Sequence, residues 1–311
     1  MTYKIAVYHL SVPKKFNEEK TNMLEFFATG AGLAGDQITN VRDHNIIDSD
    51  IAVIQGWIAD KVSSPHLKLR NDTIAQQLSR KKYVVTADSN LFLYANKDNP
   101  LHYLRYSFNG IFPNTGIYCD TNIDPRRWQQ IQQDLNISLQ DYRTNGNHIL
   151  ICLQRNGGWS MGGQTVCNWT KDMLVKLRQH TARPIVLRAH PGDKQANTYL
   201  TPLMELADQY GFTISKNPRL QDDLAGCWAV VNHNSSPAVA AAIEGYPVFV
   251  TDPTRSQCRD IANTDLSKIE QPHLPERLQW AQRLAMSHWK FDELRTGQVW
   301  SHMRAFVRDI A

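Results

Sequence analysis

The sequence predicts an α/β protein of two successive domains, each built on a mostly parallel sheet that helices cover. Short apolar runs alternate with helical stretches, which is the rhythm of parallel sheets. That rhythm pauses at the turn signal Asn145-Gly146-Asn147 and then starts again. A length of 311 residues also suits two such domains better than one. We therefore expect domains at 1–145 and 146–311, with the C-terminal helix crossing back.

The first half supplies the elements of the N-terminal domain. Apolar runs predict its strands, and amphipathic stretches between them predict its helices. The expected strands are 5–8, 50–55 and 83–86, and the expected helices are 18–27, 72–80 and 125–135. From Asp88 to Gly116 the pattern weakens and aromatic, Asn, Gly and Pro residues dominate, so we expect loops that line a site there.

The second half restarts the same alternation. Its expected strands are 148–153, 184–188, 212–215, 229–232 and 247–250. Its expected helices are 165–178, 198–210, 220–227, 238–244, 275–286 and 291–307. In such sheets ligands bind beyond the carboxyl ends of the strands, so the segments that follow these strands are the first places to search for a site.

Composition restricts the function only mildly. A net charge of +4 permits an anionic substrate or nucleic acid without requiring one. No apolar stretch approaches the roughly 20 residues that span a bilayer, so we expect no stable membrane insertion. The N-terminus lacks a secretory pattern, which predicts a cytoplasmic protein, in the host cytoplasm if it is phage-encoded. The scattered cysteines are expected to be reduced, and nothing indicates the oligomeric state.

The first motif is the segment 185–193, in which an apolar strand runs into Arg188, His190-Pro191, Gly and Asp. Cation-capable side chains then stand at the ligand edge of a sheet, where Arg188 or His190 can hold a phosphate oxygen. The alternative is a strand-to-loop exit with a surface histidine, to which we give equal weight.

The second motif is the segment 230–248, where a strand ends in Asn and Ser residues and an alanine-rich helix begins. Ser235 and Ser236 bring hydroxyls to the N-terminus of that helix, whose free backbone N–H groups attract a phosphate. Plain N-capping is the competing interpretation.

The third motif is Gln154-Arg155-Asn156-Gly157-Gly158, directly after the first strand of the second domain. Gly157 and Gly158 let the backbone approach a ligand closely, and Arg155 adds a charge. The pattern is neither a Walker loop nor G-x-G-x-x-G, and an ordinary turn explains it equally well. All three motifs are nevertheless expected at one edge of one sheet.

The combination of His190-Pro191, Ser235-Ser236 and a helix ending in Glu244-Gly245 resembles a superfamily of GT-B glycosyltransferases. It includes bacterial sialyltransferases, capsule polysaccharide (Kdo-type) transferases and CDP-glycerol-type polymerases. The resemblance covers roughly residues 148–252. It implies two Rossmann-like domains facing a cleft, with His190, Ser235 and Ser236 on the donor nucleotide and its phosphates. It leaves Glu244 either on the donor ribose or in packing alone.

The segment 74–88 is similar to the part of phage DNA β-glucosyltransferase that carries a catalytic aspartate. Independently of that resemblance, Asp88 is expected at the carboxyl end of a strand, where a cleft carboxylate should lie. Transfer with inversion needs a base near the acceptor hydroxyl, which makes Asp88 the first candidate. Asp36, after the glycine-rich stretch 29–35, is the second.

The mixed aromatic and basic segment 102–110 includes Arg105 and Asn109, which we assign to an acceptor site, with ordinary core and rim packing as the alternative. Asp48-Ser49-Asp50 resembles a metal-binding D-x-D motif, but it precedes its strand, so we interpret it as a loop. No cluster has convincing metal-ligand spacing, so we expect no metal and no cofactor, the nucleotide sugar being the donor substrate.

These observations predict a glycosyltransferase that uses a nucleotide sugar. The favoured acceptor is 5-hydroxymethylcytosine in phage DNA, which would require flipping the base out of the duplex. A saccharide or lipid-linked polysaccharide acceptor is the rival. A UDP-sugar epimerase, or a non-catalytic protein that binds nucleotides or nucleic acid, remains as a further alternative.

Overall fold

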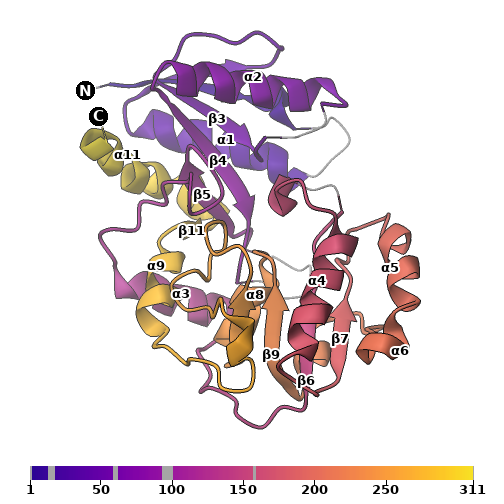
Figure 1. Ribbon diagram of the computed structural model, residues 1–311. Coiled ribbons are helices and arrows are strands. Elements are labelled where there is room, and N and C mark those ends of the chain that lie inside the picture. Colours follow the sequence, from indigo (N-terminus) through magenta and orange to yellow (C-terminus); the bar gives the residue numbers. More distant parts are fainter. Residues whose placement is uncertain (1, 13–17, 59–61, 93–100, 157–158, 311) are drawn as a thin grey trace. The chain divides into compact units, whose positions relative to one another are not determined.

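The structure is a computed structural model that describes residues 2–12, 18–58, 62–92, 101–156 and 159–310 (Figure 1). The chain divides into two compact units. Unit 1 contains residues 1–90, 99–130 and 282–311, and unit 2 contains residues 91–98 and 131–281. Each unit has its own sheet of mainly parallel strands with helices, so the predicted α/β fold of two sheet domains is confirmed.

The sheet of unit 1 has the strand order β11-β5-β4-β3-β1-β2. Strands β1 to β4 pair in parallel, whereas β5 and β11 pair antiparallel at one edge. The central strand β3 is buried along its whole length, as its run of apolar residues requires. The strands are β1 Lys4–Tyr8, β2 Gln37–Val41, β3 Ile51–Gln55, β4 Tyr83–Ser89, β5 Leu104–Phe108 and β11 His288–Trp289.

Helices from both ends of the chain complete unit 1. Phe27 of α1 and Trp300 of α11 meet edge to face with ring centroids 5.5 Å apart, in one core with strands β1, β3 and β4. A Cβ on Gly30 of α1 would lie 2.1 Å from the carbonyl oxygen of Leu294, so the glycine is what lets α10 approach α1. The helices are η1 His9–Ser11, α1 Glu18–Leu33, α2 Pro65–Ser79, α3 Pro125–Leu135 (which runs on into unit 2), α10 Phe291–Arg295 and α11 Gln298–Ile310.

The sheet of unit 2 has the order β10-β9-β6-β7-β8, and all its pairs are parallel. Its strands are β6 His148–Cys152, β7 Ile185–Arg188, β8 Phe212–Ile214, β9 Cys227–Asn232 and β10 Val248–Val250. Its helices are η2 Trp159–Met161, α4 Val166–Arg178, α5 Asn197–Met204, α6 Ala207–Tyr210, α7 Leu220–Leu224, α8 Pro237–Ile243, η3 Leu266–Lys268 and α9 Leu278–Ala285 (which runs on into unit 1). Its core packs Trp169, Leu174 and Leu177 of α4 against Ile151 and Leu187 of the sheet.

The prediction of loops throughout 88–116 is wrong, because β5 lies inside that stretch and is buried along its length. The polar residues of β5 interrupt the apolar pattern by which a buried strand is predicted. In the structure Arg105 forms an ion pair with Asp88, and the Ser107 hydroxyl donates to the carbonyl oxygen of Gly110 at 2.6 Å. Satisfied in this way, polar side chains can lie in a buried strand. The polar edge strand β2 and the short β11 were also not predicted.

Asp36 has a structural place in unit 1. It immediately precedes β2, at the amino edge of the parallel strands, so it does not lie at the ligand edge where a catalytic group was expected. Its carboxylate accepts hydrogen bonds from the Tyr3 amide at 2.9 Å, the Trp300 indole at 2.6 Å and the Arg304 guanidinium at 2.9 Å. Asp36 therefore ties α11 to the start of the sheet, and we leave it out of the catalytic set.

We expect Asp36→Asn to weaken unit 1 at pH 7 by about 1–3 kcal/mol, because a buried charged acceptor is lost. Burial alone would raise the pKa of Asp36, but the hydrogen bonds from Arg304, Tyr3 and Trp300 outweigh it and hold that pKa below its usual value. The stability from this depressed pKa is present above about pH 4 and is lost as the pH falls through the folded-state pKa. Hydrogen exchange of the β1 amides in urea, which reports on unit 1, should therefore show a smaller loss of stability between pH 7 and acid for Asp36→Asn than for the wild type. The exposed Asp292→Asn is the control, and an acid loss equal to that of the wild type would contradict the assignment.

Candidate functional site

The order of the strands singles out one place on the sheet of unit 2. From β6 the chain moves to β7 and β8 on one side, and it then returns to β9 and β10 on the other. The strand order therefore reverses between β6 and β9. In parallel α/β sheets, ligands bind at the carboxyl edge beside such a reversal, since the following loops diverge there and leave a crevice.

Side chains from three loops are joined at this reversal. The amide of Gln154, after β6, donates to the side-chain oxygen of Asn234, after β9, at 2.9 Å. The amide of Asn234 in turn donates to the Asp252 carboxylate, after β10, at 3.0 Å and to the Ser160 carbonyl at 2.9 Å. The loops beyond β6, β9 and β10 therefore form one hydrogen-bonded edge.

Three polar atoms at this edge are buried without a hydrogen-bond partner among the described residues. They are Gln154 Oε1, Asn232 Oδ1 and Ser235 Oγ. The residues Gln154 and Asn232 are 5% and 0% exposed. Buried polar atoms almost always have partners, and a group of exceptions calls for an explanation. A ligand with hydroxyl or amino groups would supply the missing donors.

His190 lies in the loop after β7 and is held in one protonation state. Its Nδ1 accepts the backbone N–H of Gly192 at 3.0 Å, so the proton of the neutral ring is on Nε2. Burial, and next the charge of Arg155, lower the pKa of His190, which keeps the ring neutral at pH 7. The Nε2–H group is therefore available as a hydrogen-bond donor.

Arg155 is exposed, and it extends to the same loop as His190. A Cβ on Gly192 would lie 2.8 Å from the Arg155 Nη2 atom, so the guanidinium stands directly over that glycine. The loops after β6 and β7 are also joined by the backbone N–H of Asn156, which donates to Asp193 at 2.9 Å. Arg155 and His190 thus place a cation and a neutral donor side by side.

His233 was not predicted as a site residue. It lies one residue after β9, and its Nδ1 is 2.7 Å from Thr251 Oγ1, which also accepts the Trp169 indole N–H at 2.9 Å. Burial lowers the pKa of His233 more than the nearby Asp252 raises it. Polar residues at the ends of apolar strands are the signal that finds His233, and the same signal finds Gln154 and Asn232.

Two predicted donor residues have other partners. The Arg188 guanidinium pairs with Asp223 and donates to the carbonyl oxygens of Asn217 and Pro218. Glu244 follows the last turn of α8, about 12 Å along the helix from Ser236, and it lies 3.8 Å from Arg143. Both geometries favour structural roles for Arg188 and Glu244.

The other predicted donor residues differ in what the structure describes. Ser236 is exposed beside Ser235 at the start of α8, whereas Gly157 and Gly158 lie outside the described residues.

In unit 1, Asp88 lies near the carboxyl end of β4, as expected, with 32% of its side chain exposed. Its Oδ2 accepts from Arg105 at 2.8 Å, and Arg105 is buried and also donates to the Ile111 carbonyl at 3.0 Å. Asn109 has a positive φ of 58°, and its side-chain oxygen accepts the Val84 N–H at 2.9 Å. Arg105 therefore anchors Asp88, and Asn109 closes the β4–β5 pairing. Neither side chain is thus presented to an acceptor substrate.

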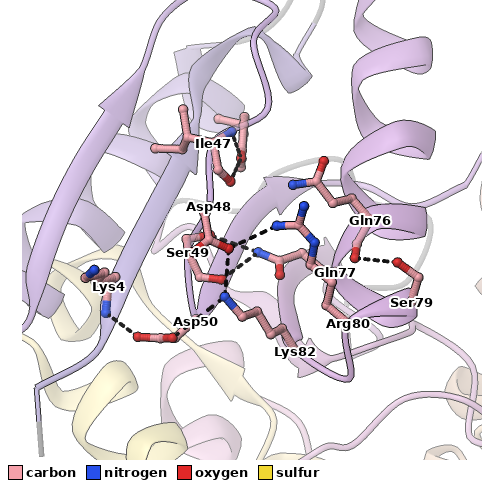
Figure 2. A network of polar contacts seen from close by, with 11 residues as sticks. Lys4, Ile47, Asp48, Ser49, Asp50, Gln76, Gln77, Ser79, Arg80 and Lys82 are labelled. Atoms are coloured by element: carbon pink, nitrogen blue, oxygen red, sulfur yellow. Dashed lines mark hydrogen bonds and ion pairs between the residues drawn. The ribbon is translucent and has the colours of Figure 1, made fainter.

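The aspartates of Asp48-Ser49-Asp50 are held by cations and backbone, as Figure 2 shows. Asp48 accepts from Arg80 at 3.0 Å and from Lys82 at 2.9 Å, while Asp50 accepts the Lys4 N–H at 2.9 Å. This network joins β1, β3 and the end of α2, at the amino edge of the sheet.

Within the described part of the chain, no group of three or more His, Cys, Asp or Glu residues could hold a metal ion. Among the same residues, no helix combines the length and apolarity needed to cross a membrane.

Two solved structures share this architecture. One is described as Thermosulfurimonas dismutans KpsC, beta Kdo 2,4 transferase; it is 12% identical with a TM-score of 0.56, over 91% of this chain and 89% of that chain. The other is the beta Kdo 2,7 transferase of the same protein, 15% identical with a TM-score of 0.54, over 95% of this chain and 98% of that chain. No protein-family model matches the sequence, and no curated protein matches it either. The chain therefore has the fold of these two transferases.

Proposed function

We propose that this protein is a glycosyltransferase that moves a sugar from a nucleotide-sugar donor to an acceptor hydroxyl. The observation that carries the proposal is the cluster of unpartnered polar atoms at the β6–β9 reversal, beside the Nε2–H donor of His190. The fold shared with two structures named as Kdo transferases supports the same conclusion.

In this proposal the donor binds to unit 2. Gln154, Asn232 and Ser235 accept or exchange hydrogen bonds with its hydroxyl and amino groups, and Arg155 and Ser236 contact a phosphate. The acceptor oxygen attacks the anomeric carbon, and the bond from that carbon to the phosphate oxygen breaks. The departing phosphate takes the electron pair, and the His190 Nε2–H group stabilises the charge that develops on it.

Asp88 of unit 1 is the proposed base that receives the proton of the acceptor hydroxyl. Its ion pair with Arg105 fixes one carboxylate oxygen. A single displacement with this base inverts the anomeric centre and requires no metal ion. Proton NMR of the product and an assay in EDTA test these two statements.

For the acceptor we favour a saccharide over hydroxymethylated DNA, because both similar structures are named as sugar transferases. The deciding experiment incubates the protein with a panel of nucleotide sugars and scores three products: transfer to oligosaccharides, transfer to hydroxymethylcytosine DNA, and epimerised donor. Transfer to DNA would overturn the saccharide choice, and an epimerised donor without transfer would identify an epimerase. The absence of turnover and of thermal protection by any nucleotide would remove the enzyme proposal.

We expect Asp88→Asn to reduce transfer by a factor of about 10² or more, because general base catalysis contributes that much. Asparagine can still accept the Arg105 hydrogen bond, so the fold and donor binding should persist. Transfer rates and donor Kd values are compared with those of the exposed neighbour variant Ser89→Ala. Full activity in Asp88→Asn would assign Asp88 to structure alone.

A further inference from the structure

The sheet of unit 1 has its own reversal of strand order, and Arg70 lies at it. From β1 the chain moves to β2 on one side and then to β3 and β4 on the other, so the order reverses between β1 and β3. Arg70 of α2 touches both sides of this point. Its Nε donates to the Ser11 carbonyl, just after β1, at 2.6 Å, and its Nη2 lies 3.5 Å from Gln55 Oε1, at the end of β3.

The guanidinium of Arg70 is partly buried and has no carboxylate partner among the described residues. Three other buried arginines of this chain do have one: Arg105 pairs with Asp88, Arg127 with Glu293 and Arg188 with Asp223. The buried Arg277 instead donates to the carbonyl oxygens of Ala242 and Gln140. Burial lowers the pKa of Arg70 to about 10, with no acidic group acting against it. A guanidinium has five N–H donors, and the contacts to Ser11 and Gln55 use only two of them.

The backbone of the residues that follow β1 and β3 packs closely around the Arg70 guanidinium. Gly56 has a positive φ of 83°, which strains any other residue, and a Cβ there would lie 2.7 Å from Arg70 Nη1, so the guanidinium would have to shift. The Ser11 hydroxyl accepts the Gln55 N–H at 3.2 Å, and the Thr86 hydroxyl donates to the Gly56 carbonyl at 2.6 Å. These bonds fix the two loop ends on which the guanidinium rests.

We propose that unit 1 binds an oxyanion, a carboxylate or a phosphate, at Arg70 where β1 and β3 diverge. A partly buried cation without a counter-charge is unfavourable, and a planar fork of N–H groups matches the two oxygens of such an anion. The carboxyl edge beside a strand-order reversal is where sheets of this kind bind ligands. His66, one turn earlier on the same face of α2, adds a polar imidazole ring beside the guanidinium.

In the proposed transfer reaction this oxyanion belongs to the acceptor, so the saccharide would carry a carboxylate or a phosphate. That assignment rests on the proposed function, whereas anion binding at Arg70 does not. The test therefore contains no donor and measures no turnover. A failure to bind anions would leave the transferase proposal standing, and a failure of transfer would leave the anion site standing.

Inorganic phosphate and glucuronate are each titrated, at constant ionic strength, into full-length protein with nitrogen-15-labelled arginine. The Arg70 Nε resonance is identified by its loss in Arg70→Gln. We expect it to shift saturably with one or both probes, and the probe with the lower Kd identifies the source of the oxyanion. If neither probe moves this resonance, the proposal is wrong.

Calorimetry with matched variants gives a second measure, since phosphate also has a proposed site in unit 2. Arg70→Gln should remove one binding event, and Arg70→Lys, which keeps the charge but loses the fork, should weaken that event about tenfold. Lys68→Gln is the control, because Lys68 is exposed on the same helix and pairs with Asp72. Unchanged binding in Arg70→Gln, or an equal loss in Lys68→Gln, would overturn the proposal.

Discussion

Replacing His190 by alanine should lower the rate of sugar transfer by about 10²–10³-fold, the cost of removing one donor that stabilises charge in a transition state. The effect should fall on kcat, because the phosphate oxygen that leaves the sugar gains its negative charge only as the bond breaks. The loop should survive the change, since the Gly192 N–H can bond to water instead. Transfer kinetics and nucleotide Kd values measure the two contributions separately.

His190→Gln is the informative companion, since its side-chain amide can still donate a hydrogen bond. We expect it to recover part of the lost kcat. Loss of nucleotide binding with unchanged kcat would make His190 a ground-state contact, and full activity in His190→Ala would remove it from the site. The pH profile gives a further check: because burial and the charge of Arg155 lower the pKa of His190, any loss of rate through protonation of this ring should appear only in acid.

Local signals in the sequence coincide at the carboxyl edge of the unit 2 sheet, where we propose that the donor binds. Apolar runs ending in Gln154, His190 and Asn232 mark the carboxyl ends of β6, β7 and β9, and a parallel sheet brings those ends to one edge. The motifs could not show which atoms remain without partners. That depends on contacts between loops, such as Gln154 with Asn234, across 80 positions of the chain.

The sequence failed where a charged residue is buried with a distant partner. Arg188 ends an apolar strand, as a residue that binds phosphate would. Only the fold shows that its guanidinium pairs with Asp223. Arg105 concealed the strand β5 in the same way. Asp36 follows a glycine-rich stretch that resembles a site loop, but its partners Trp300 and Arg304 lie more than 260 positions away. No local pattern contains such pairings.

The second large effect, a loss of stability, is expected when the ion pair between Asp223 and Arg188 is broken. Asp223 is 3% exposed, and besides Arg188 it accepts from the Ser215 hydroxyl at 2.6 Å and the Asn217 amide at 2.8 Å. Removing its carboxylate leaves the Arg188 cation buried without a counter-charge. We therefore expect Asp223→Ala to destabilise unit 2 by about 3–5 kcal/mol.

Hydrogen exchange of the β7 amides during urea titration measures this loss in unit 2 alone, which whole-chain unfolding of a two-unit protein would blur. The neighbouring Asp222→Ala is the control, because Asp222 pairs with Arg219 at the surface, and it should change little. The double variant Arg188→Met/Asp223→Leu should recover much of the stability, since it removes both charges together. If it also retains nucleotide binding, Arg188 acts only through Asp223. If stability returns but nucleotide binding is lost, Arg188 contacts the donor after all, and its pairing with Asp223 must open when the donor binds.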